Sequence, residues 1–109
     1  MSHLLFVYGK LRKGGGASLP ENFPRSKFIG LATAKGSLFD LGDFPGVLLE
    51  KSGTIIGEIY EVDTQTLNEL DRFEATADYR RSQTKVTLDE TSIGCWIYCP
   101  DPERCREFP

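Results

Sequence analysis

Two apolar runs predict the most regular strands of the chain. Leu4 to Tyr8 holds aromatic and β-branched residues and ends at Gly9, a pattern typical of a buried first strand that leads into a loop. Thr54 to Val62 predicts a later strand, which we expect to lie centrally in the sheet. Gly57 within it indicates a bulge or a close approach by another backbone.

The segment between these runs predicts a meander of shorter strands. From Phe28 to Leu41 the apolar runs are broken by Gly30 and Gly36. Asp43 to Gly46 contains a Pro-Gly pair, which favours a turn because the two residues supply a restricted and a permissive backbone angle.

Two more strands and an irregular tail are predicted near the C-terminus. The strands are Tyr79 to Leu88 and Ile93 to Tyr98, with a polar turn at residues 89–92 between them. The tail from Pro100 holds three prolines and predicts irregular structure.

One helix is predicted between the later strands. The side chain of Asp63 can accept the exposed amide hydrogens of a first turn, so it is expected to cap a helix from Thr64 to Phe73. Leu67, Leu70 and Glu74 fall at spacings that place all three on one face. A carboxylate is therefore expected in line with the apolar stripe.

Together these elements predict an α+β fold, in which a strand-rich, curled or barrel-like sheet packs against one main helix. The 109 residues fit a single domain, 1–109, with an irregular tail from about residue 100. The 39% hydrophobic and 27% charged residues are typical of globular proteins. The strand order does not follow from the sequence.

Charge and the N-terminal segment exclude several partners. The formal net charge is -3 and no long basic run is present, so no nucleic-acid partner is expected. The first apolar stretch is too short for a signal-peptide core or a membrane span, so we expect a cytoplasmic protein without a membrane partner.

Cys95, Cys99 and Cys105 are an odd number of cysteines near the C-terminus, which predicts reduced thiols rather than a disulfide framework. The first two would share one side of a strand at a separation of about 13 Å, too far for a disulfide or for one tetrahedral zinc ion. We therefore expect no metal site. His3, the only histidine, is expected to be solvated, so no nucleophile has an evident basic partner.

The loop expected after the first strand is the candidate binding segment. Tyr8, Gly9, Lys10 and Leu11 lie where successive backbone amides can turn toward one point and hold a carboxylate, with Arg12 nearby. The alternative is a flexible surface connection. Phosphate-binding motifs are excluded, because no Gly-Lys-Ser or Gly-Lys-Thr occurs.

Glu74 is the candidate acid/base. On the inward face of a helix it would lose water, and desolvation raises the pKa of a glutamate from about 4.3 toward neutral pH. If the helix frays before Glu74, the residue would instead be solvated in an acidic turn with Asp71 and Asp78. Periodicity alone does not distinguish the two.

Four elements in a fixed order carry a resemblance to a known family: residues 7–12 (Val-Tyr-Gly-Lys-Leu-Arg), 44–46 (Phe-Pro-Gly), 57–63 (Gly-Glu-Ile-Tyr-Glu-Val-Asp) and 70–74 (Leu-Asp-Arg-Phe-Glu) followed by Tyr79-Arg80-Arg81. Together they resemble the gamma-glutamylcyclotransferase-like family over about positions 5 to 98. The ordered set is more specific than any one motif.

The resemblance implies a mixed barrel of about half a dozen strands with flanking helices and a cavity at its mouth. It implies that Tyr8, Gly9, Lys10 and Leu11 hold the glutamyl moiety. It also implies that Glu74 takes a proton from the α-amine of a small γ-glutamyl substrate, which then attacks its own γ-carbonyl and releases 5-oxoproline and an amine or amino acid. No cofactor is implied.

Two departures from the family pattern leave alternatives open. The family usually has Ser or Thr at Lys10 and Gly at Ala75, so the ligand's charge and the turn that carries Glu74 are both in question. Alternative functions are a non-catalytic ligand-binding or regulatory module with the same cavity, and a thiol- or metal-dependent role for the cysteines.

Overall fold

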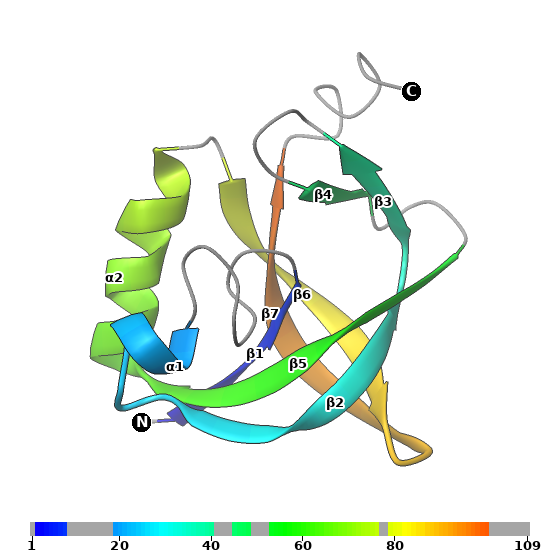
Figure 1. Ribbon diagram of the computed structural model, residues 1–109, viewed down its shortest axis with the longest axis horizontal. Coiled ribbons are helices and arrows are strands. Elements are labelled where there is room, and N and C mark those ends of the chain that lie inside the picture. The colour runs from blue at the N-terminus through cyan, green and yellow to red at the C-terminus, as the bar shows by residue number, and fades with distance from the viewer. Residues whose placement is uncertain (1, 9–18, 41–44, 49–52, 77–78, 101–109) are drawn as a thin grey trace.

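The computed structural model describes residues 2–8, 19–40, 45–48, 53–76 and 79–100. Five strands form a closed barrel in the order β1-β5-β2-β6-β7 (Figure 1). Their bounds are β1 Ser2–Val7, β2 Lys27–Lys35, β5 Thr54–Asp63, β6 Tyr79–Leu88 and β7 Thr91–Pro100. The ring closes where β1 pairs in parallel with β7, whereas the other pairs are antiparallel. The expected α+β, barrel-like fold is confirmed.

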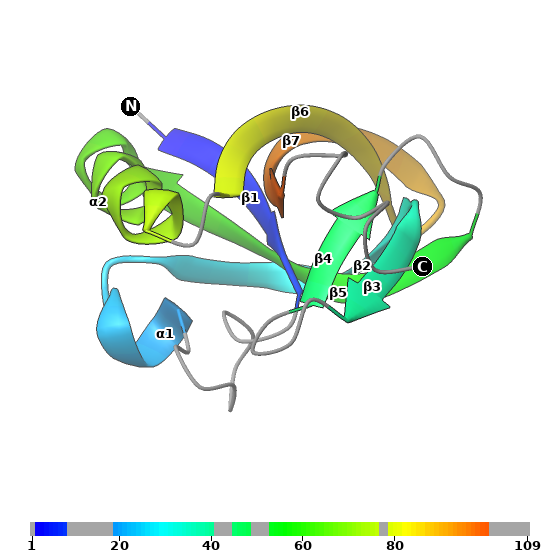
Figure 2. The same ribbon diagram turned by 90° about the horizontal axis from the view of Figure 1, so that it is seen from above.

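The remaining elements lie outside the ring. Helix α2, Thr64–Ala75, packs along one side of the barrel, and the short helix α1 is Leu19–Asn22. Strands β3, Ser37–Asp40, and β4, Pro45–Leu48, form a separate antiparallel sheet. Figures 1 and 2 show this small sheet on the side away from α2. Within the described part of the chain, no helix has the length and apolar character needed to cross a membrane.

The core has two layers because strand side chains alternate between the faces of the barrel. On β7, Cys95, Ile97 and Cys99 belong to the cluster inside the barrel. Tyr98, with the opposite orientation, belongs to a second cluster that also contains Leu67 and Leu70 of α2. This second cluster therefore joins the helix to the outer face of the barrel.

The start of α2 is set by the expected cap. The side-chain Oδ1 of Asp63 accepts a hydrogen bond from the backbone N–H of Thr66 at 2.7 Å. This interaction satisfies one of the amide groups that the first helical turn leaves without a partner. It also lowers the pKa of the Asp63 carboxyl below its ordinary value.

Three local predictions need correction. Gly30 does not break its strand, because β2 runs through it with an irregularity in the pairing between Phe28 and Gly30. Pro45 and Gly46 lie in β4 rather than in a turn, and a proline is tolerated there because it is the first residue of the strand. The turn after β6 is only Asp89–Glu90, whose positive φ angles of 48° and 66° match a tight hairpin turn. Asp43, Phe44 and the tail from residue 101 lie outside the described residues.

Gly57 lies in tight contact with the neighbouring strand β1. A Cβ atom at this position would collide with the carbonyl oxygen of Val7 and with the ring of Phe6. Of the two alternatives expected at Gly57, the close approach by another backbone is confirmed, whereas the irregularity in the pairing of β2 with β5 lies between Phe28 and Gly30. The backbones of β1 and β5 can pair here only because residue 57 has no side chain.

The substitution Gly57→Ala tests this constraint. It should lower the free energy of unfolding by about 1–3 kcal/mol, because the extra methyl group must displace backbone or an aromatic ring. Gly94→Ala on β7 is the control, since a Cβ there has no neighbour within 4 Å. Urea denaturation of both variants measures the difference, and equal stability of Gly57→Ala and the wild type would contradict the packing argument.

Candidate functional site

Several polar and aromatic residues converge at one end of the barrel. Because β1 and β7 are parallel and β6 is antiparallel to β7, the ends of β1 and β7 lie at the same end as the start of β6. Helix α2 also ends there, shortly before β6 begins (Figure 1). This topology gathers Tyr8, Glu74, Tyr79 and Tyr98, which are far apart in the sequence.

Glu74 lies in the last turn of α2 and is only 2% exposed. It shares the buried face of the helix with Leu67 and Leu70, as the periodicity predicts. The helix does not fray before it: α2 continues to Ala75, and the hydroxyl of Thr76 donates to the carbonyl of Phe73 at 2.7 Å. The alternative of a solvated Glu74 is therefore wrong.

Tyr8 follows directly after β1 and is 9% exposed. Its hydroxyl donates a hydrogen bond of 2.6 Å to the backbone carbonyl of Tyr98, which joins the end of β1 to the end of β7. Gly9, Lys10, Leu11 and Arg12 lie outside the described residues. Of the predicted site residues, the structure thus brings Tyr8 and Glu74 to the same end of the barrel.

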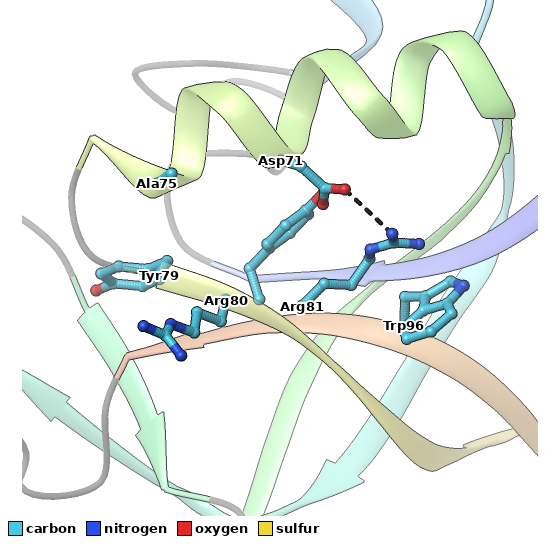
Figure 3. Close-up of a pocket in the computed structure, with 7 residues that line it drawn as sticks. Asp71, Ala75, Tyr79, Arg80, Arg81 and Trp96 are labelled. Carbon is cyan, nitrogen blue, oxygen red and sulfur yellow. Dashed lines mark hydrogen bonds and ion pairs between the residues drawn. The ribbon is translucent and has the colours of Figure 1, made fainter.

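A polar network beside Glu74 was not predicted from the sequence. The hydroxyl of Tyr98 donates to Asp71 Oδ1 at 2.8 Å, and Asp71 Oδ2 pairs with Arg81 Nη2 at 3.1 Å (Figure 3). The guanidinium of Arg81 also lies 4.2 Å from the centre of the Trp96 ring, a geometry that favours a cation–π interaction. The network connects α2, β6 and β7 within one turn of Glu74.

The network forms part of the wall of an open cavity of about 390 Å³ between α2 and the β6–β7 hairpin. Figure 3 shows its lining side chains. They are Asp71, Ala75, Tyr79, Arg80, Arg81, Trp96 and Tyr98. Glu74 does not belong to this lining, although its neighbour Ala75 does. The cavity therefore lies next to Glu74. Tyr98 lines the cavity and is also close enough to Glu74 to feel its charge.

Burial, more than any other cause, raises the pKa of Tyr98 above its ordinary value. The hydrogen bond to Asp71 and the negative charges of Asp71 and Glu74 raise it further, whereas Arg81 lowers it. The phenol is therefore a hydrogen-bond donor throughout the physiological pH range. The electrostatic influence of Glu74 also indicates that its carboxylate lies near this hydroxyl.

The cysteines in the described part of the chain are poorly placed for nucleophilic or metal chemistry. Cys95 and Cys99 form no disulfide and lie on the same face of β7, as predicted, and both are buried. Burial raises the pKa of Cys95 to about 11, which disfavours the nucleophilic thiolate. Among the described residues, no three His, Cys, Asp or Glu side chains cluster as metal ligands do. Cys105 lies outside the described residues.

Comparisons with known proteins agree on one family. A profile of the family described as gamma-glutamyl cyclotransferase, AIG2-like, matches residues 5–108. A Methanocaldococcus jannaschii protein with a provisional gamma-glutamylcyclotransferase name is 40% identical over 105 residues, 93% of this chain and 86% of that protein. The crystal structure of an AIG2-like protein from Mus musculus has a TM-score of 0.81 at 26% identity, covering 99% of this chain and 84% of the other.

A further relative is named for its substrate. The Niallia circulans protein gamma-L-glutamyl-butirosin B gamma-glutamyl cyclotransferase is 41% identical over 75 residues. The match covers 64% of this chain but only 44% of that protein.

The buried state of Cys95 predicts slow alkylation. The change in pKa from 9.0 to about 11 lowers the thiolate fraction at pH 8 about a hundredfold, so the folded protein should react with iodoacetamide at least that much more slowly at Cys95 than the urea-unfolded chain. Peptide mapping by mass spectrometry measures the rate at each cysteine separately. Equal alkylation rates of Cys95 in the folded and unfolded protein would contradict this prediction and support a thiol-dependent function.

Proposed function

The chain belongs to the gamma-glutamyl cyclotransferase, AIG2-like family, and we propose that it cyclises the glutamyl group of a small γ-glutamyl amide. The products are 5-oxoproline and a free amine or amino acid. The observation that carries this proposal is the burial of Glu74 at the end of the barrel where Tyr8 begins the predicted binding segment.

In the proposed reaction, Glu74 takes a proton from the α-ammonium group of the substrate. The neutral α-nitrogen attacks the γ-carbonyl carbon, and a five-membered ring forms through a tetrahedral intermediate. The bond between the γ-carbon and the amide nitrogen then breaks. Over the whole reaction two protons move from the α-nitrogen to the leaving nitrogen, and Glu74 carries them. No oxidation or reduction occurs, and we propose no cofactor.

We propose that Tyr8, Gly9, Lys10 and Leu11 hold the glutamyl part of the substrate, chiefly through backbone amide groups. Such donors suit both the α-carboxylate and the negative charge that develops on the γ-carbonyl oxygen. The hydrogen bond of Tyr8 to the Tyr98 carbonyl supports this assignment, because it holds the first residue of the segment at the same end of the barrel as Glu74.

The identity of the leaving amine is the finer part of the proposal. The Niallia circulans relative is named for gamma-L-glutamyl-butirosin B, which carries a γ-glutamyl group. We propose the shared chemical class, a γ-glutamyl amide, for this chain. We also propose that the reaction takes place in the cytoplasm and within a single domain.

The substitution Glu74→Gln tests the catalytic assignment. It keeps the shape of the side chain but removes the proton acceptor, so release of 5-oxoproline should fall by about 10²–10⁴-fold while ligand binding survives. Release is measured by chromatography from a panel that contains γ-glutamyl amino acids, γ-glutamyl alkylamines and γ-glutamyl lysine. Glu69→Gln is the matched control, because it makes the same change on the same helix at a less buried position.

The outcomes separate the two functions considered. Full activity in Glu74→Gln would remove Glu74 from the mechanism. Binding of a panel member by the wild type without any release of 5-oxoproline would instead indicate the non-catalytic binding module.

A further inference from the structure

We propose that Tyr98 is a positioning residue, which sets Glu74 relative to the start of the binding segment at Tyr8. The inference rests on the proposed function. Its basis is that one residue contacts both halves of the proposed site: its backbone binds Tyr8, and its side chain binds the helix that carries Glu74.

The backbone contact of Tyr98 holds the start of the proposed binding segment in place. The Tyr8 hydroxyl donates to the carbonyl oxygen of Tyr98 at 2.6 Å, and both residues are buried. The paired register of β1 and β7 is short: Leu5 lies opposite Trp96 and Phe6 opposite Ile97. The Tyr8 bond therefore extends the attachment of β1 to β7 as far as the first residue of the binding segment.

The side-chain contact of Tyr98 holds the helix that carries Glu74 in place. The Tyr98 hydroxyl donates to Asp71 at 2.8 Å and lies 3.4 Å from the carbonyl oxygen of Leu67. Asp71 is three residues before Glu74, which is less than one helical turn. Because a helical turn moves as a unit, a restraint on Asp71 also limits the movement of Glu74 around and along the helix axis.

A second strand holds the same carboxylate. Arg81 binds the other oxygen of Asp71 at 3.1 Å, and Arg81 is the direct partner of Tyr98 in the register of β6 and β7. The Trp96 ring beneath the guanidinium of Arg81 limits its movement (Figure 3). Each oxygen of Asp71 is thus attached to a different strand, so the end of α2 cannot rotate without loss of at least one bond.

The functional consequence follows from the geometry of proton transfer. A displacement of about 1 Å of a catalytic group can reduce the rate on the order of a hundredfold, even when the substituted residue does not touch the substrate. Removal of the Tyr98 hydroxyl should therefore affect the chemical step more than substrate binding. The backbone bond to Tyr8 would remain, because it uses the carbonyl group of residue 98.

The test compares two Tyr→Phe substitutions. Tyr98→Phe should lower kcat for 5-oxoproline release at least tenfold, with less than a twofold change in KM. Tyr60→Phe is the control: its buried hydroxyl also donates to a carboxylate, that of Glu58 at 3.0 Å, but this carboxylate belongs to β5 and not to α2. Tyr60→Phe should lose thermal stability without a comparable loss of kcat.

Substitutions of Asp71 provide a second test with a conservative rescue. Asp71→Asn keeps an oxygen that can accept from Tyr98, whereas Asp71→Ala removes it. Asp71→Asn should therefore retain more of kcat than Asp71→Ala. In the Tyr98→Phe background the two Asp71 variants should differ by less than they do in the wild type, because the hydroxyl that distinguishes them is absent.

The outcomes are distinct. Turnover by the wild type with full kcat in folded Tyr98→Phe would overturn the positioning role and leave the proposed function intact. Equal loss of kcat in Tyr98→Phe and Tyr60→Phe would also overturn it, since general destabilisation would then explain both. Absence of turnover in the wild type with every panel member would overturn the proposed function and this role with it.

Discussion

Closure of the barrel by the parallel pairing of β1 with β7 is the constraint on which the arrangement of the site depends. The two strands come from opposite ends of the described sequence, and they must run in the same direction for both to end at the same edge. Contacts between such distant segments bring a large loss of chain entropy, which the short ladder alone offsets only in part. The buried hydrogen bond from Tyr8 to the Tyr98 carbonyl and the packing of Phe6 inside the barrel supply further stabilisation.

The narrow interior of the ring explains the residues found there. A barrel of eight strands has an interior that side chains just fill, and a barrel with fewer strands has a narrower interior. Small residues accordingly face the interior on two paired strands: Ala32 and Ala34 on β2, and Gly57 on β5. They leave space for the ring of Phe6, which a Cβ at position 57 would meet. The larger tyrosines 60 and 98 instead belong to the outer cluster that includes residues of α2.

Sequence reasoning works where the determinants are local. The cap at Asp63, the helix that follows and the inward face of Glu74 all depend on spacings of a few residues, and they were predictable. The strand β5 was also predictable from its composition. The sequence alone did not indicate that Pro45 and Gly46 form a strand, because β4 exists through its pairing with β3.

The network of Asp71, Arg81 and Tyr98 was missed for a related reason. Arg81 and Tyr98 can be recognised as neighbours from the sequence only when the β6–β7 register is known. A two-residue turn at Asp89–Glu90 fixes that register and places Arg81 opposite Tyr98. The sequence indicated a polar turn of four residues, 89–92, from which the pairing could not be counted. A tighter assignment of the turn would have identified this pair, but not its contact with α2.

Two carboxylates near the end of α2 have different surroundings, and this difference supports the proposed division of roles. Asp71 has one oxygen bound by Tyr98 and the other by Arg81, so both oxygens of its carboxylate already hold structural contacts. The Tyr98 phenol stays protonated, because burial and nearby negative charge raise its pKa, so it is not available as a proton acceptor. Asp71 and Tyr98 thus suit structural roles, and proton transfer is assigned to Glu74. The helix that orients the acid/base would then be held by contacts that are separate from the proton transfer itself.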